Sequence, residues 1–271
     1  MKKIGVRAHD YGKMEPEKLA QVLHEEGYQC AQLALPKVIA GIDSYADITL
    51  NHLERIRESF TKWNVDIPVF SCYMDLGNPD PDVRRYALDT MKKCLAYSKE
   101  VGAKVVGTET AYPRLTPEAK KIWHPFMMDS IKAAVEEAAR LDVKLAIEPV
   151  HSHPLQNLET VLEVFDTIND PAHLRMIFDM SNLLPSPDTT DQNKYWNEWL
   201  KETGKYIEAC HIKDFVLDVN SEYRGTLLGE GVLDYGPLSE WLAQQTKDMY
   251  LLREEMDPAT AKVDIAFLKK L

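Results

Sequence analysis

Two patterns of hydrophobic and polar positions alternate along the whole chain. Short runs that are almost continuously apolar are typical of parallel strands buried on both faces. Longer stretches with apolar residues every three or four positions are typical of helices packed on such strands. The predicted strands are Ile4–Arg7, Cys30–Leu35, Ile67–Cys72, Lys104–Glu109, Lys144–Glu148, Met176–Asp179, Ile207–His211 and Met249–Glu254. The predicted helices are Glu15–Glu26, Asn51–Trp63, Asp80–Val101, Thr116–Leu141, Leu158–Ile168, Gln192–Glu202, Pro237–Thr246 and Ala259–Leu271.

Eight strand–helix units follow one another with no linker rich in Pro, Gly or Ser and no break in composition. This order predicts an α/β fold, a single (β/α)8 TIM barrel over residues 1–271, with its active site at the carboxyl ends of the strands. A doubly wound open sheet is the alternative. It is disfavoured because neither a Gly-x-Gly-x-x-Gly nor a Gly-x-x-x-x-Gly-Lys-Ser/Thr phosphate loop follows a strand.

Composition and charge narrow the class of protein. The chain has 271 residues, a hydrophobic fraction of 45% and a formal net charge of −11. No run approaches the ~20 apolar residues that span a bilayer, and Arg7 and His9 interrupt the first apolar segment before it resembles a signal sequence. We therefore expect a cytoplasmic protein with no membrane partner. The negative charge argues against a nucleic-acid partner, because binding phosphates requires clustered Lys and Arg.

The cysteines suggest a reducing compartment. They are widely spaced and fit no Cys-x-x-Cys pattern. Three of them lie in or beside predicted strands and one lies in a predicted helix, so we expect buried free thiols. They are Cys30, Cys72, Cys94 and Cys210.

Four predicted strands end on a residue that can bind a metal ion. Glu148, Asp179, His211 and Glu254 close apolar runs at intervals of 31, 32 and 43 residues, each about one strand–helix unit. These side chains are expected to converge, because the carboxyl ends of barrel strands meet at one face. Buried carboxylates need a compensating charge, and a shared cation supplies it. One imidazole, three carboxylates and no sulfur favour Mn²⁺ or Mg²⁺, with Co²⁺ or Zn²⁺ as alternatives.

The last of these positions has a competitor. Glu255 follows Glu254 directly, and neighbouring residues on a strand point to opposite sides. Only one of the two is expected to face the barrel interior. We choose Glu254 because it closes the apolar run.

Five motifs occur in order along the chain, namely Glu148-Pro149, Phe178–Asn182, His211–Asp214, Leu228–Asp234 and Glu254–Pro258. Together they resemble the xylose-isomerase-like (AP endonuclease 2-like) TIM-barrel superfamily, of the sugar phosphate isomerase/epimerase type. The resemblance covers nearly the whole chain. Its most specific parts are His-x-Lys-Asp followed by Gly-x-Gly-x-x-Asp.

The resemblance implies one divalent metal ion held by Glu148, Asp179, His211 and Glu254. In ketose 3-epimerases of the superfamily the first and last of these glutamates are also the acid/base pair, which moves a proton beside a carbonyl through an enediolate. Endonuclease-type members carry additional metal-binding histidines. Those are absent from this sequence, which argues against DNA repair.

Residues near the strand ends are candidates for binding the substrate. They are His9, Glu109, His151, His153, Asn182, Lys213 and Arg224. Arg224 stands where relatives carry a substrate-binding arginine. Asn182 and Pro154 stand where ketose 3-epimerases carry a histidine and a glutamate, which argues against a free-ketose 3-epimerase activity but not against the metal site.

These observations predict an enzyme, an isomerase or epimerase of a small sugar, sugar acid or sugar phosphate. A lyase that dehydrates a keto-polyol such as a keto-inositol is the alternative, with His151 or His153 as a proton donor to the leaving group. A non-catalytic sugar-binding barrel is less favoured, because a binder has little need for two opposed glutamates. Glu230 in the Gly229-Glu-Gly231 segment would repel phosphate, which favours an unphosphorylated substrate. The resemblance also implies a homodimer.

Overall fold

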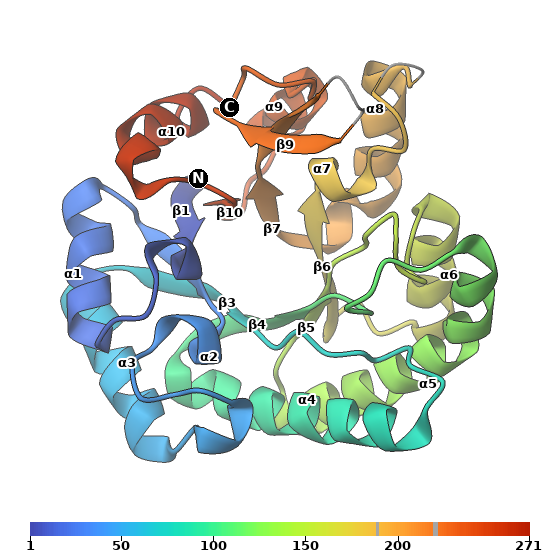
Figure 1. Cartoon of the computed structure of the whole chain (residues 1–271), viewed down its shortest axis with the longest axis horizontal. Helices are drawn as coiled ribbons and strands as arrows, with labels where there is room; N and C mark the ends of the chain where they lie inside the picture. The colour runs from blue at the N-terminus through green and yellow to red at the C-terminus, as the bar shows by residue number, and fades with distance from the viewer. Residues whose placement is uncertain (188–189, 219–221) are drawn as a thin grey trace.

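Eight parallel strands close into a barrel in a computed structural model that describes residues 1–187, 190–218 and 222–271 (Figure 1). Around the barrel the strands are ordered β1-β10-β7-β6-β5-β4-β3-β2. Their bounds are β1 Lys2–Arg7, β2 Cys30–Leu33, β3 Asp66–Ser71, β4 Ala103–Thr108, β5 Leu145–Ile147, β6 Leu174–Asp179, β7 Ile207–Ile212 and β10 Met249–Arg253. The predicted (β/α)8 barrel is confirmed.

Helices follow the strands and form the outer ring (Figure 1). The long ones are α1 Pro16–Glu26, α3 Leu50–Lys62, α4 Pro81–Val101, α5 Pro117–Leu141, α6 Leu158–Ile168, α8 Gln192–Thr203, α9 Gly236–Ala243 and α10 Ala261–Leu268. Shorter turns are α2 Leu35–Val38, α7 Met180–Leu183, η1 Ala8–Tyr11, η2 Tyr45–Asp47, η3 Gly204–Tyr206 and η4 Pro258–Thr260. None of the helices in the described ranges has both the length and the apolar character needed to cross a membrane.

Local signals determine several helix ends. The Asp80 side chain accepts hydrogen bonds from the backbone N–H groups of Asp82 and Val83, which caps α4. Gly102 ends the same helix with a φ of 81°, a left-handed conformation in which glycine avoids the strain of a side chain. The predicted helix Pro237–Thr246 ends earlier, at Ala243.

The structure contains one hairpin that the sequence patterns did not predict. Strands β8 Asp214–Leu217 and β9 Tyr223–Thr226 pair antiparallel after β7, and β9 lies over the carboxyl end of the barrel (Figure 1). Its second strand is exposed over most of its length, so it lacks the apolar run that identifies a buried strand. The predicted strand Cys30–Leu35 also ends early, because Leu35–Val38 turns into α2.

The barrel interior is filled with side chains. One layer is built from Cys30, Val69, Val105, Ala146, Ile177, Ala209, Tyr250 and Leu252. Gly107 keeps this layer close-packed, since a Cβ atom there would lie 2.6 Å from Val69 Cγ1. All four cysteines are free and buried, as predicted. The barrel is therefore a packed core, and polar chemistry is confined to its ends.

Candidate active site

Three predicted metal ligands meet at the carboxyl end of the barrel. Glu148 follows β5 directly, Asp179 ends β6, and His211 lies in β7 beside Asp179 in the strand register. All three side chains are buried, and each offers one ligand atom within 4.8 Å of the others. Residues more than 30 positions apart in sequence are thus brought together by the shared register of neighbouring parallel strands.

Glu254 joins this cluster through His211. Its Oε1 lies 3.3 Å from His211 Nδ1, and Glu148 Oε2 lies 3.1 Å from the same nitrogen. Glu255 lies at the rim, where its carboxylate contacts Lys213 and the Tyr223 hydroxyl. Glu254, the first residue after β10, therefore faces His211, whereas the left-handed backbone at Glu255 places its carboxylate at the rim.

The donor set fits a divalent cation. Ligand atoms bound to one ion at about 2.1 Å and at right angles stand about 3 Å apart, close to the spacings around His211 Nδ1. The Nε2 atom of His211 is buried and has no hydrogen-bond partner among the described residues. Carboxylate oxygens with one imidazole are suitable for hard or borderline ions. Glu148, Asp179, His211 and Glu254 are therefore the residues that could hold a metal ion.

Opposite charges balance one another in this cluster. Burial lowers the pKa of His211, but the carboxylates of Glu148 and Glu254 raise it more, to about 9. Burial raises the pKa of Glu254, yet His211, Lys213 and Arg7 bring it well below its usual value. Burial also raises the pKa of Asp179, which Lys213 partly offsets. The carboxylate of Glu254 is consequently kept ionised, as a base must be.

Asp214 explains why the two most specific motifs occur together. Its buried carboxylate accepts hydrogen bonds from the backbone N–H groups of Phe215, Gly229, Gly231 and Leu233. A Cβ atom at Gly231 would lie 2.1 Å from Asp214 Oδ1, so only glycine allows this approach. The backbone N–H groups of Gly229 and Gly231 are thus occupied by the protein's own carboxylate.

A cavity of about 280 Å³ opens above the cluster. Glu254, Lys213 and Asn182 line it, and Asn182 donates a 2.8 Å hydrogen bond to Glu148 Oε1. Three further predicted residues also line it, namely His9, Glu109 and His153. Small substrates are bound in cavities of about this size, near the lower end of the usual ~300–1,000 Å³ range.

Glu109 and His153 lie next to each other in the lining of this cavity. Glu109 Oε2 lies 3.6 Å from His153 Nδ1. Burial, together with Glu148 and Glu254, raises the pKa of Glu109 to about 8. Burial lowers the pKa of His153 to about 4, although Glu148 opposes this. These shifts favour a protonated Glu109, which is a proton donor, and a neutral His153, which is a proton acceptor, in the same wall of the cavity.

Comparison with known proteins identifies the family of the chain. Residues 20–271 match the family model described as xylose isomerase-like TIM barrel. The chain belongs to this family. The predicted resemblance is therefore confirmed at the level of the family.

Several relatives of known name share this barrel. L-ribulose-5-phosphate 3-epimerase UlaE of Escherichia coli O157:H7 (strain EC4115 / EHEC) is 29% identical over 173 residues, which cover 62% of this chain and 56% of UlaE. The matched region thus spans little more than half the length of that relative. The apo crystal structure of YcjR, a 3-keto-D-glucoside 4-epimerase from E. coli, is 17% identical with a TM-score of 0.76 and covers 100% of both chains. The IolI protein with a zinc atom is 18% identical with a TM-score of 0.73, over 99% of this chain and 95% of IolI.

Two residues that were predicted to bind the substrate lie away from the candidate metal ligands. His151 lines a neighbouring pocket together with Asn182 and Tyr223. Arg224 is exposed on β9, where its guanidinium lies 2.8 Å from Asp218 Oδ2, and it is not among the described residues that line the cavity. Its proposed contact with substrate stays a prediction.

Sequence reasoning missed several cavity residues. Arg7 lies 3.8 Å from Glu254 and is paired with Asp10, while Tyr73 and Arg114 line the wall. Arg7 ends β1, so the strand-end rule that found the acidic ligands would also have found it. Tyr73 follows the predicted strand Ile67–Cys72 directly, so the same rule covers it, whereas Arg114 lies in a loop with no comparable signal.

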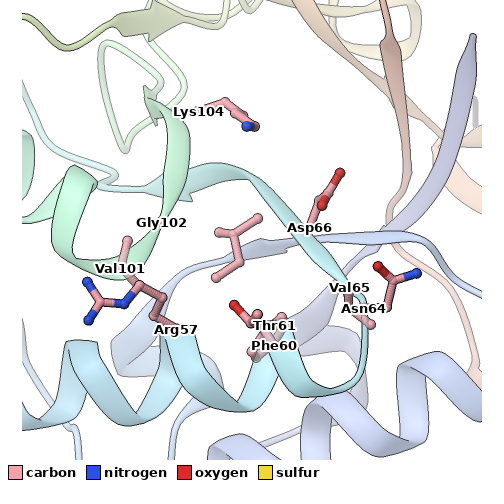
Figure 2. Close-up of a pocket in the computed structure, with 10 residues that line it drawn as sticks. Arg57, Phe60, Thr61, Asn64, Val65, Asp66, Val101, Gly102 and Lys104 are labelled. Atoms are coloured by element: carbon pink, nitrogen blue, oxygen red, sulfur yellow. The ribbon is translucent and has the colours of Figure 1, made fainter.

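A second depression lies at the opposite end of the barrel, where β3 and β4 begin (Figure 2). Two of its charged side chains have ordinary surface partners, since Asp66 pairs with Lys3 and Arg57 lies 3.8 Å from Glu100. The amino-terminal face of a TIM barrel contributes to stability rather than to chemistry. The candidate active site is therefore the cluster of Glu148, Asp179, His211 and Glu254 with the cavity above it.

Proposed function

We propose that this protein is a divalent-metal-dependent isomerase or epimerase that acts on a small carbohydrate through an enediolate. The observation that carries the proposal is the convergence of Glu148, Asp179, His211 and Glu254 beneath a polar cavity. The epimerase names of UlaE and YcjR support the same reaction class. Mn²⁺ or Mg²⁺ suits this donor set best, with Co²⁺ or Zn²⁺ as alternatives.

In this proposal Glu148 and Glu254 are the acid/base pair. One carboxylate removes the proton from the carbon beside a carbonyl, and the other glutamate returns a proton to the opposite face or to the neighbouring carbon. A bound divalent cation supplies electrophilic polarisation of the substrate oxygens. Asn182 orients Glu148 through its hydrogen bond, and Arg7 and Lys213 keep Glu254 ionised.

We propose an unphosphorylated substrate. The backbone N–H groups of Gly229 and Gly231 already bind Asp214, so a substrate phosphate would have to displace a buried carboxylate to reach them. The cavity walls are rich in polar side chains, as recognition of hydroxyl groups requires. UlaE is named for a phosphorylated sugar and YcjR for a keto-glucoside, so relatives of both kinds exist.

A metal-dependent lyase is the second candidate, and one observation favours it. Glu109 and His153 form a wall of the cavity that also contains Glu254, whereas His151 lines the neighbouring pocket. A protonated Glu109 could protonate a leaving hydroxyl after Glu254 removes the neighbouring proton, and the products would be water and an unsaturated ketone. In a pure epimerase the same pair would bind a substrate hydroxyl instead.

We propose a cytoplasmic enzyme that forms a homodimer and has neither a nucleic-acid nor a membrane partner. The formal net charge of −11 supports the exclusion of nucleic acid.

Deuterium exchange followed by proton NMR tests the reaction class. The protein is loaded with Mg²⁺ in D₂O and incubated with ketoses, keto-glycosides, keto-inositols and sugar acids, alongside the Glu254→Gln variant. Exchange next to a carbonyl that the variant abolishes supports enediolate chemistry. The labelled carbon distinguishes isomerase from epimerase, and a product lacking a hydroxyl favours the lyase. Bound metal with no exchange in any compound would contradict the proposed reaction on these classes of substrate.

A further inference from the structure

Lys213 places a positive charge inside the cluster that is proposed to hold the metal. It lies two residues after His211, so both side chains point to the same side of the chain. Only 6% of its side chain is exposed. Its Nζ atom lies 3.0 Å from Asp179 Oδ2 and 3.2 Å from Glu254 Oε2. A buried ammonium requires such partners, because leaving it unpaired in the interior is costly.

The metal ion would need the same oxygens. Asp179 and Glu254 are both in the donor set, and each has one oxygen within 3.2 Å of the ammonium. A divalent cation between these carboxylates would also stand close to a like charge in a poorly solvated place, where repulsion is strong. Ammonium and metal therefore compete for the same carboxylates.

A third carboxylate offers the ammonium another partner. Glu255 Oε1 lies 3.3 Å from Lys213 Nζ, and its side chain is 38% exposed at the rim. Glu255 has a φ of 52°, a left-handed conformation that costs energy for a residue other than glycine. The Tyr223 hydroxyl holds its carboxylate at 2.8 Å from the hairpin side. A strained backbone conformation persists where surrounding contacts hold a residue in place. Here the left-handed backbone and the Tyr223 hydrogen bond together place the Glu255 carboxylate within reach of Lys213.

The backbone of Lys213 is fixed, so its side chain has to make the adjustment. The Lys213 carbonyl accepts a 2.7 Å hydrogen bond from the Tyr235 hydroxyl. The next residue, Asp214, is anchored by four backbone N–H groups. A long side chain with four rotatable bonds can move its ammonium from the inner carboxylates to Glu255 while the main chain stays in place.

We propose that Lys213 is an internal competitor of the metal ion. It neutralises Asp179 and Glu254 when no metal is bound, and it keeps Glu255 as its remaining partner when a divalent ion takes those carboxylates. This inference rests on the proposed metal site. It assigns to Lys213 and Glu255 a role in setting metal affinity, in which Glu255 is a positioning residue and not a ligand.

The test is a double-mutant cycle on metal affinity, which does not require knowledge of the substrate. Wild type, Lys213→Met, Glu255→Gln and the double variant are stripped with chelator and titrated with Mn²⁺ by calorimetry. Glu240→Gln is the control, because it removes one exposed carboxylate from α9 on the outer ring. Melting temperatures are recorded with and without the ion, since tighter binding to the folded state adds stability.

Lys213→Met is expected to bind Mn²⁺ about tenfold more tightly than wild type, a change of about 1.4 kcal/mol. It should also melt at a lower temperature once stripped, because its inner carboxylates lose their cation. Glu255→Gln is expected to weaken Mn²⁺ binding severalfold in the presence of Lys213 and much less in the Lys213→Met background. Glu240→Gln should bind like wild type.

Three results would overturn the inference. Unchanged or weaker Mn²⁺ binding by Lys213→Met would show that the ammonium does not compete. An equal effect of Glu255→Gln in both backgrounds would remove the role of the rim carboxylate. If Lys213→Met fails to fold, unchanged Mn²⁺ binding by Glu255→Gln alone would remove it as well. No Mn²⁺ binding by folded wild type would instead remove the proposed metal function, and the inference with it.

Discussion

Replacing Asp214 by asparagine tests directly how the loop beside the site is held. The Asp214 Oδ1 atom accepts the N–H groups of Phe215 and Leu233 at 2.9 and 3.3 Å, and Oδ2 accepts those of Gly229 and Gly231 at 3.1 Å each. Asparagine keeps the shape but turns one acceptor into an N–H donor. Two of the four hydrogen bonds are then lost, and the new side-chain N–H group points at two backbone N–H groups.

The magnitude follows from these contacts. A hydrogen bond to a charged group contributes about 1.5–3 kcal/mol, so losing two lowers the free energy of unfolding by about 3–6 kcal/mol. In a protein of this size 1 kcal/mol shifts the melting temperature by about 2–4 °C. Asp214→Asn should therefore melt at least about 6 °C below wild type.

Scanning calorimetry measures this shift, and Asp234→Asn is the matched control. Asp234 is exposed at the end of the same loop, and its Oδ1 accepts one N–H group, from Gly236 at 2.9 Å. Its replacement should cost about 1 kcal/mol or less. If Asp214→Asn melted within about 2 °C of wild type, or no lower than the control, the loop would not depend on this carboxylate.

Three further predictions address the site. His211→Ala should lose the metal ion on dialysis, since it removes the one nitrogen ligand; full retention in metal quantification would contradict the ligand assignment. Glu254→Gln should keep the fold and lower turnover by about 10²–10⁴ at saturating metal, whereas Glu255→Gln should keep most activity under the same conditions; the reverse order in a rate assay would move the base to Glu255. Burial, with Glu148 and Glu254, raises the pKa of Glu109 to about 8. Between pH about 4.3, the pKa of an unfolded glutamate, and pH about 8, the carboxyl ionises in the unfolded state but stays protonated in the folded state. The free energy of unfolding of the wild type therefore falls as the pH rises through this range. The melting temperature of Glu109→Gln relative to wild type, both in chelator, should therefore rise between about pH 5 and about pH 8, and a constant difference would refute this.

The barrel and its candidate metal ligands were largely predictable from local sequence patterns. The alternation of buried runs and amphipathic stretches is a property of neighbouring residues, so it gave all eight strands and their helices to within a few positions. Parallel strands of a barrel end at one face, and this rule alone brought Glu148, Asp179 and His211 together. The sequence patterns did not predict the hairpin β8–β9. Its strand β9 is exposed over most of its length, so it lacks the apolar run that identifies a buried strand.

Other features depended on how strands are staggered and side chains directed in three dimensions. Glu254 and Glu255 are chemically identical neighbours, and only their opposite orientations separate a buried carboxylate beside His211 from one at the rim. The ion pairs of Lys213 could not be predicted from the sequence, because its three carboxylate partners come from the ends of two other strands, β6 and β10. Hydrophobic periodicity is a property of residues that are close in the sequence, so it can be recognised there. Charge compensation depends on which distant segments come together, and only the tertiary structure determines those contacts.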